Sequence, residues 1–280
     1  MNIYFETSPI TYLKKIEPLL LQREANNNLI LGLLGRAVER ESEVELHLGV
    51  VEEEGEIMYA FMQTAPHDWI LADAGVVDEP MLRNIVNVII DAGLEIPGVH
   101  GPSTQATIFK DFLVKEHGRT MTKHMGQLIY QLDHVQLKPQ VEGRLKLATD
   151  EDADLFTDWL WQFGQEANEP IAMERARGLA ETMIQHASLY KWVVADKPVS
   201  MVNQSRKTRH GTTINAVFTP NAHKRKGYAT AAVASLSQQL LAEGFRFCSL
   251  YTDASNPTSN NIYQRIGYNQ VGKAVVYKTM

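Results

Sequence analysis

The sequence lacks the features that mark several classes of protein. It has one cysteine, Cys248, among 280 residues, which excludes an intrachain disulfide framework, and the apolar residues around Cys248 predict a buried, reduced thiol. The formal net charge of −6 disfavours a general nucleic-acid-binding protein, because such proteins need a basic surface to replace phosphate counterions. No apolar run reaches the length of a membrane span or resembles a secretory signal, and the separate histidines show no metal-ligand spacing. We therefore expect a cytoplasmic protein that binds no nucleic acid, no membrane and no metal.

The composition, with 44% apolar and 21% charged residues, is that of an ordinary globular protein of one large or two modest domains. In residues 1–135 the apolar periodicity predicts two helices, three meandering strands, a helix, a strand, a helix and a strand. The predicted helices are residues 9–23, 29–41, 81–93 and 103–117, and the predicted strands are residues 44–51, 56–63, 68–73, 98–101 and 125–132. We expect the last of these strands to close this half of the chain.

Residues 136–280 repeat the same order of elements after a strand at residues 144–148. The predicted helices are residues 152–166, 173–187 and 230–243, and the predicted strands are residues 189–195, 198–206, 213–218 and 245–251. The sequence therefore predicts a mixed α/β (α+β) fold built from two related domains, each a mostly antiparallel mixed sheet flanked by helices. We call residues 1–135 the first half and residues 136–280 the second half; the boundary lies in residues 133–143, which have little apolar periodicity.

The turn between the strand at 213–218 and the helix at 230–243 has the composition of an anion site. The strand stops at Thr219-Pro220, and the turn that follows contains three adjacent cations and two small residues, Gly227 and Ala229. A helix N-terminus presents unpaired N–H groups and the positive end of the helix dipole, and small residues let the backbone approach a phosphate closely. The alternative is a solvated basic turn, which a lone glycine would favour.

This turn and the segment at residues 253–268 together resemble the acetyl-CoA-binding core of the GNAT superfamily of N-acetyltransferases. The family has an Arg/Gln-x-x-Gly-x-Gly/Ala turn, and here the turn is Lys224-Arg-Lys-Gly227-Tyr-Ala229. Lys224 stands where Arg or Gln is usual, and Arg225 stands where glycine is common. Residues 253–268, DASNPTSNNIYQRIGY, are similar to the fifth-strand and fourth-helix segment of the family nearly throughout.

The resemblance implies a cofactor site, a proton donor and an acceptor side. The backbone of Val217 and Thr219 is expected to pair with the pantetheine arm, and the amides of residues 225–230 to hold the pyrophosphate. The residues implied in acetyl-CoA binding are Val217, Phe218, Thr219, Lys224, Arg225, Lys226, Gly227, Tyr228, Ala229, Thr230, Asn256, Ser259 and Asn260. Tyr263 is implied as the donor of a proton to the departing thiolate, a role that suits a phenol within hydrogen-bond reach; the alternative for Tyr263 is a packed aromatic residue.

The sequence offers two candidates for the base that accepts the proton of the amine. Glu166 and Glu169 lie on the first helix of the second half and in the turn after it, which border the acceptor in the family. Either carboxylate could attract a cationic amine or accept its proton through water, and the alternative is a solvated surface role.

The first half has no counterpart of the cofactor motifs. Residues 74–80, AGVVDEP, carry acid instead of base, and carboxylates there would repel a pyrophosphate. We therefore expect tandem GNAT-like domains of which only the second binds acetyl-CoA, with no metal. The predicted function is direct transfer of an acetyl group to a primary amine of a small molecule, amino acid or peptide, by a monomer or homodimer. The alternatives are a non-catalytic acyl-CoA-binding or interaction module, and an enzyme that uses a longer acyl-CoA.

Overall fold

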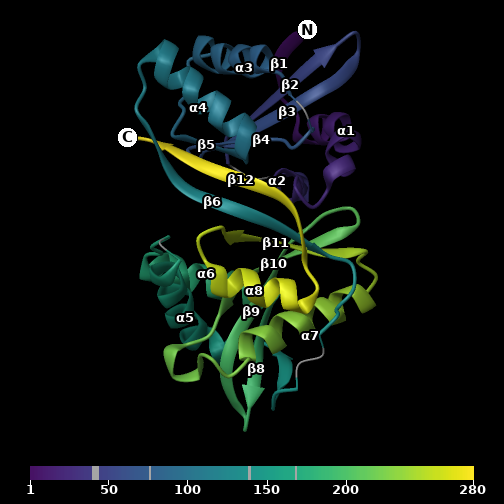
Figure 1. Ribbon diagram of the computed structural model, residues 1–280, viewed down its shortest axis with the longest axis vertical. Helices are drawn as coiled ribbons and strands as arrows, with labels where there is room; N and C mark the ends of the chain where they lie inside the picture. The colour runs from purple at the N-terminus through teal and green to yellow at the C-terminus, as the bar shows by residue number, and fades with distance from the viewer. Residues whose placement is uncertain (40–43, 76, 138–139, 168) are drawn as a thin grey trace.

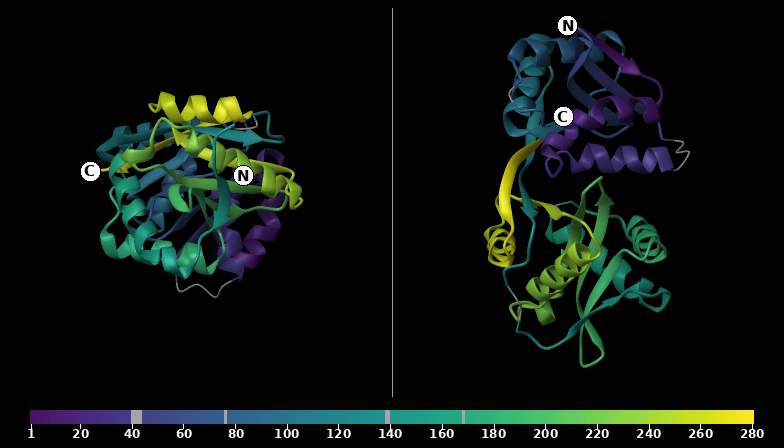
Figure 2. Two further views of the ribbon diagram at one scale, coloured as in Figure 1. Left: turned by 90° about the horizontal axis from the view of Figure 1, so that it is seen from below. Right: turned by 90° about the vertical axis from the view of Figure 1, so that its right-hand side faces the viewer.

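The computed structural model describes residues 1–39, 44–75, 77–137, 140–167 and 169–280. The chain forms two lobes stacked along its long axis, with the first half of the sequence above and the second half below in Figure 1. Two long strands, β6 (Met121–Leu132) and β12 (Asn269–Thr279), run between the lobes. Both chain termini lie on the upper lobe (Figure 2).

Eight α-helices are assigned within the described residues. They are α1 (Pro9–Leu20), α2 (Asn28–Glu39), α3 (Glu79–Asp91), α4 (Ser103–His117), α5 (Ala153–Glu166), α6 (Met173–Gln185), α7 (Tyr228–Ala242) and α8 (Pro257–Ile266). Besides β6 and β12, the strands are β1 (Asn2–Glu6), β2 (Leu46–Glu53), β3 (Glu56–Thr64), β4 (Trp69–Leu71), β5 (Gly98–Pro102), β7 (Arg144–Leu147), β8 (Leu189–Val194), β9 (Lys197–Lys207), β10 (Gly211–Phe218) and β11 (Phe247–Asp253).

The predicted helices and strands are present, with ends shifted by a few residues. The sequence analysis does not predict β1, because its five residues show no clear alternation of apolar and polar side chains. The predicted end of the second helix at residues 40 and 41 lies outside the described residues, as do Val76, Pro139 and Asn168. Cys248 is free and buried, so the predicted burial of this thiol is confirmed, and burial raises its pKa to about 12.

The strands form one continuous sheet in the order β1-β2-β3-β4-β5-β12-β6-β11-β10-β9-β8-β7. The prediction that residues 125–132 close the first half alone is wrong, since β12 from the second half lies between β5 and β6, and β6 pairs with β11 on its other side. Each half therefore donates its last strand to the sheet of the other. Periodicity could not show this exchange, because it identifies a strand but not its neighbours. The sequence division at residues 135 and 136 stays a prediction.

Helices cover both faces of the sheet in the lower lobe. Met201 and Val202 are adjacent on β9 and point to opposite faces, as alternation in a strand requires. Met201 packs in a core with side chains of α5 and α6, whereas Val202 packs in a core with side chains of α7 and α8. The upper lobe has its own core, to which β12 contributes Val275.

Polar contacts between the halves fix the lobes against each other. The Glu24 carboxylate accepts hydrogen bonds from the Thr208 hydroxyl at 2.6 Å and from the backbone and ring nitrogens of His210, each at 2.7 Å. The Arg206 Nε donates to Asn28 Oδ1 at 2.9 Å. These contacts tie the segment between α1 and α2 to the strands of the second half.

No helix in the described part of the chain is long and apolar enough to cross a membrane. Within those same residues, no group of three or more His, Cys, Asp or Glu side chains is arranged to hold a metal ion.

Candidate functional site

Strands β10 and β11 separate from each other partway along their length. They pair in parallel only from Gly211 opposite Phe247 to Thr213 opposite Ser249. Beyond this point the register of β10 against β9 shifts between Asn215 and Phe218, and Ala216 has a φ of +48°, which marks a bulge. The bulge bends β10 away from its parallel neighbour. The predicted residues Val217, Phe218 and Thr219 lie on the diverging part of β10 and directly after it.

The turn before α7 presents an uncapped helix N-terminus. Gly227 precedes the helix with a φ of +82°, and no side chain among the described residues caps the helix. The first helical hydrogen bond runs from the Ala231 amide to the Gly227 carbonyl at 3.0 Å, so the amides of Tyr228, Ala229 and Thr230 precede the ladder. The structure thus confirms that the predicted basic turn opens a helix.

Arg225, where the family commonly has glycine, also adopts a left-handed backbone, with a φ of +62°. A side chain in this region costs about 1–2 kcal/mol, which glycine avoids. Arg225 therefore adopts a backbone conformation that glycine would adopt without this cost. Lys226 is the third cation of the turn and is exposed.

Lys224 links the turn to the end of α5. Its Nζ lies 2.7 Å from both carboxylate oxygens of Glu166 and 5.9 Å from the centre of the Phe218 ring. The structure therefore brings together one candidate base, Glu166, and two candidate cofactor residues, Phe218 and Lys224. Glu166 is engaged with a cation in this arrangement.

The segment between β11 and α8 is held by its own side chains. Asn256 caps α8, its Oδ1 accepting from the Ser259 amide at 3.1 Å. The Asn260 Nδ2 donates to the Asp253 carbonyl at 3.2 Å, while the Asn260 Oδ1 is buried without a hydrogen-bond partner among the described residues. Asp253 Oδ1 accepts from the amide and hydroxyl of Ser255, both at 2.8 Å. These bonds position Asn256 and Asn260 at the open end of β11.

Tyr263 lies in a group of three tyrosines. Its ring centre is 6.3 Å from that of Tyr130 on β6 and 6.0 Å from that of Tyr268. Its hydroxyl has no hydrogen-bond partner within the described parts of the chain, and burial raises its pKa to about 12. Tyr263 is therefore protonated at neutral pH, as a proton donor must be.

Glu169 is paired with a residue that the sequence analysis does not single out. Its Oε1 lies 2.6 Å from Nε2 of His124, which belongs to β6 of the first half. Strand β6 has one extra residue, His124, opposite the step from Val276 to Tyr277 on β12. No local signal identifies His124, because its position depends on the exchange of β6 into the second lobe.

His124 of this pair also lines a pocket of about 310 Å³. Its lining residues are residues 123–126 of β6 and residues 253–255, which are the last residue of β11 and the two residues after it. The pocket thus lies between a first-half strand and the segment that positions Asn256.

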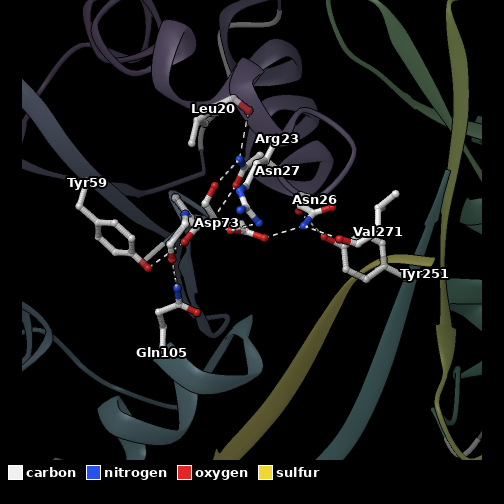
Figure 3. A network of polar contacts seen from close by, with 11 residues as sticks. Leu20, Arg23, Asn26, Asn27, Tyr59, Asp73, Gln105, Tyr251 and Val271 are labelled. Atoms are coloured by element: carbon white, nitrogen blue, oxygen red, sulfur yellow. Dashed lines mark hydrogen bonds and ion pairs between the residues drawn. The ribbon is translucent and has the colours of Figure 1, made fainter. Parts of the chain in front are cut away.

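The corresponding place in the first half also has two parallel strands, β4 and β5, which pair at Trp69 and Ile70. There, side chains form hydrogen bonds with the backbone groups of the segment that follows β4 (Figure 3). The Asn27 side chain accepts from the Asp73 amide at 2.8 Å and donates to the Asp73 carbonyl at 3.0 Å. Tyr59 donates to the Ala72 carbonyl at 2.8 Å, and Gln105 donates to the Gly75 carbonyl at 2.9 Å.

The helix that follows this closed segment is capped by acid. Asp78 Oδ1 accepts from the Met81 amide at 2.9 Å at the start of α3. A carboxylate therefore occupies the N-terminus of α3, whereas the N-terminus of α7 is uncapped. The described residues of the predicted acidic turn agree with the expectation that carboxylates lie here.

The chain resembles known proteins in part of its sequence and in its fold. Residues 193–276 match the family model described as FR47-like protein, and no curated protein matches the chain. A GNAT-family acetyltransferase from Colwellia psychrerythraea is 11% identical, covers 100% of both chains and has a TM-score of 0.63. A GCN5-related N-acetyltransferase from Sphaerobacter thermophilus is 14% identical, with 99% of this chain and 95% of that chain covered and a TM-score of 0.60.

A tandem GNAT protein from the clavulanic acid biosynthesis pathway is 12% identical, with 99% of this chain and 98% of that chain covered and a TM-score of 0.57. At such identities the likeness to solved structures shows the fold alone. The comparisons confirm the fold class and the resemblance predicted from the sequence.

Proposed function

Because the chain has the tandem GNAT fold with an FR47-like domain in its C-terminal part, we propose that it is an N-acetyltransferase that moves an acetyl group from acetyl-CoA to a primary amine. The observation that carries this proposal is the divergence of β10 from β11 beside the uncapped N-terminus of α7. These two features give one half of the chain an open strand edge and an anion site at the same place.

The residues present fit acetyl-CoA. An extended pantetheine arm pairs with β10 at Val217 and Thr219 as an added strand would. The amides of residues 225–230 and the dipole of α7 hold the pyrophosphate, together with the charges of Arg225 and Lys226. Asn256 uses its Oδ1 as a helix cap, so its amide nitrogen is the donor left for a pantetheine carbonyl. Ser259 and Asn260 lie at the start of the same helix.

The chemistry needs no enzyme nucleophile. The amine nitrogen attacks the thioester carbon, the new C–N bond forms, and the C–S bond breaks with its electron pair on sulfur. Tyr263 donates its proton to that sulfur, and a backbone amide of β10 stabilises the carbonyl oxygen. Glu166 and Glu169 are the carboxylates proposed to attract the cationic amine and to accept its proton through water. The products are an acetylated amine and CoA with a free thiol.

The experiment that tests this proposal is a calorimetric titration of acetyl-CoA and CoA into the pure protein, followed by a thiol-release screen of primary amines. Saturable binding is expected, and Gly227→Glu should abolish it, because the variant places a side chain at a positive φ and a carboxylate in the anion turn. Absence of binding to the unmodified protein at millimolar ligand would refute the proposal. Binding without thiol release from any amine would favour the non-catalytic alternative, and release only from longer acyl-CoA would change the donor.

A further inference from the structure

We infer that β6 of the first half supplies part of the acceptor site of the second half, with His124 as a specificity-determining residue for an extended, peptide-like primary amine. This inference rests on the proposed function and names the class of acceptor. It begins from the exchange of strands, which places a first-half segment beside the residues after β11.

The His124–Glu169 pair spans the two halves with defined geometry. An ionised carboxylate only accepts hydrogen bonds, so the 2.6 Å contact is made by the Nε2–H of His124 to Glu169 Oε1. The Glu169 amide donates to the Gly164 carbonyl at 3.0 Å. A Cβ added at Gly164 would lie 2.8 Å from the Glu169 carbonyl oxygen, so the turn after α5 packs directly on the helix. The backbone of Glu169 is therefore held against α5.

One edge of β6 is open at the pocket. Pairing with β11 ends at Gln127 opposite Asp253, and the last contact on that side is the Ala254 amide to the Gly126 carbonyl at 2.9 Å. On its other side β6 pairs with β12 as far as Met121. Residues 121–125 thus have no strand beside them on the β11 side within the described chain. An extended peptide satisfies such an edge with its own backbone groups.

His124 and the tyrosine that packs on the proposed acid lie on the same strand. Tyr130 on β6 contacts Tyr263, and His124 lies six residues along β6 from Tyr130. An extended peptide matches the rise of a β-strand, so it can follow β6 residue by residue, whereas a compact amine contacts only a short part of the strand.

Two acceptors with the same α-amino group test the inference: glycinamide and tetraglycinamide. The unmodified enzyme should show a KM at least tenfold lower for tetraglycinamide than for glycinamide, with similar kcat at saturation. His124→Asn should remove at least tenfold of this preference while leaving the KM for acetyl-CoA within twofold. His134→Asn is the matched control, since His134 is exposed just beyond the other end of β6.

Binding provides a readout that does not need turnover. Tetraglycinamide should bind the CoA-saturated protein by calorimetry, and His124→Asn should weaken that binding at least tenfold without changing the affinity for CoA. An unchanged peptide affinity and KM in His124→Asn would overturn the inference, and would assign the bulge and the charges of β6 to protection of a strand edge. A fall in kcat alone would overturn it too. Loss of CoA binding by the unmodified protein would instead refute the proposed function.

Discussion

Each half places the same elements around one pair of parallel strands, β4 and β5 in the first half and β10 and β11 in the second. The backbone after β4 is hydrogen-bonded by side chains, whereas β10 diverges from β11. In the first half, Asn27 occupies the backbone groups of Asp73, and the acid of Asp78 caps the next helix. In the second half, β10 bends away from β11, and α7 begins at Gly227 without a cap. A few side chains, rather than the fold, decide which of the two helices has a capped N-terminus and which parallel strand is followed by side-chain hydrogen bonds to its backbone.

The helices that follow the second parallel strand of each half, α4 after β5 and α8 after β11, show a further difference. Phe109, counted from Ser103 of α4, holds the same helical place as Tyr263, counted from Pro257 of α8. Both side chains are buried, but only Tyr263 carries a hydroxyl. The same aromatic position can therefore serve packing in one half and, as we propose, proton transfer in the other.

The largest expected effect is the difference between substitutions at Gly227 and at Gly75. Gly227 follows β10 in the second half, and Gly75 follows β4 in the first half. Gly227 has a φ of +82° and Gly75 a φ of +84°. Gly227→Glu should weaken acetyl-CoA binding at least 100-fold, whereas Gly75→Glu should lose about 1–2 kcal/mol of stability through backbone strain and keep its cofactor affinity. Calorimetry and thermal unfolding measure the two effects. Equal loss of binding in both variants would mean that the halves are not functionally distinct.

Tyr263→Phe should give the second half the residue type that the first half has at the equivalent position, Phe109. We expect kcat to fall about 100-fold or more, as for removal of a general acid, with acetyl-CoA affinity unchanged. Because burial raises the Tyr263 pKa to about 12, the unmodified enzyme should show no loss of rate from Tyr263 deprotonation up to about pH 10. Steady-state kinetics across pH check both statements, and full activity in the variant would remove Tyr263 from the mechanism.

Asn27→Ala should leave the backbone groups of Asp73 in the first half without these side-chain hydrogen bonds and should lower the stability of the protein. Asn27 is buried and bonds to the Leu20 carbonyl and to both backbone groups of Asp73, which would lose their partners. We expect a loss of about 2–4 kcal/mol in the free energy of unfolding, measured by urea denaturation. The variant should gain no affinity for CoA, because Asp78 still caps α3. Acquired CoA binding would show that the amide alone keeps the first half empty.

The smallest effect is expected for Glu166→Gln. The Glu166–Lys224 ion pair is about 40% exposed on each side, and exposed pairs contribute about 0.2–1 kcal/mol. Acetyl-CoA affinity should change less than threefold, and kcat should change less than in Glu169→Gln with a peptide acceptor. A 100-fold fall in kcat would instead identify Glu166 as the base.

Most of the local structure could be predicted from the sequence. The helix predicted at residues 103–117 ends at Gly118 in a left-handed conformation, and the turn predicted at Gly227 opens α7. These signals are local, since a cap or a left-handed turn depends on residues within one helical turn. The contacts of Glu166 and Glu169 were not predictable, because each partner comes from another segment of the chain.

The sequence by itself determined the order of elements, the basic, glycine-containing turn before α7 and the acidic turn in the first half, because these follow from periodicity, glycine and charge. Tertiary structure alone decided that β6 and β12 change places, that His124 meets Glu169, and that Asn27 fills the backbone after β4. The physical reason is that strand neighbours and buried polar partners are selected by closure of the whole sheet, which joins residues more than one hundred positions apart, such as Tyr130 and Tyr263.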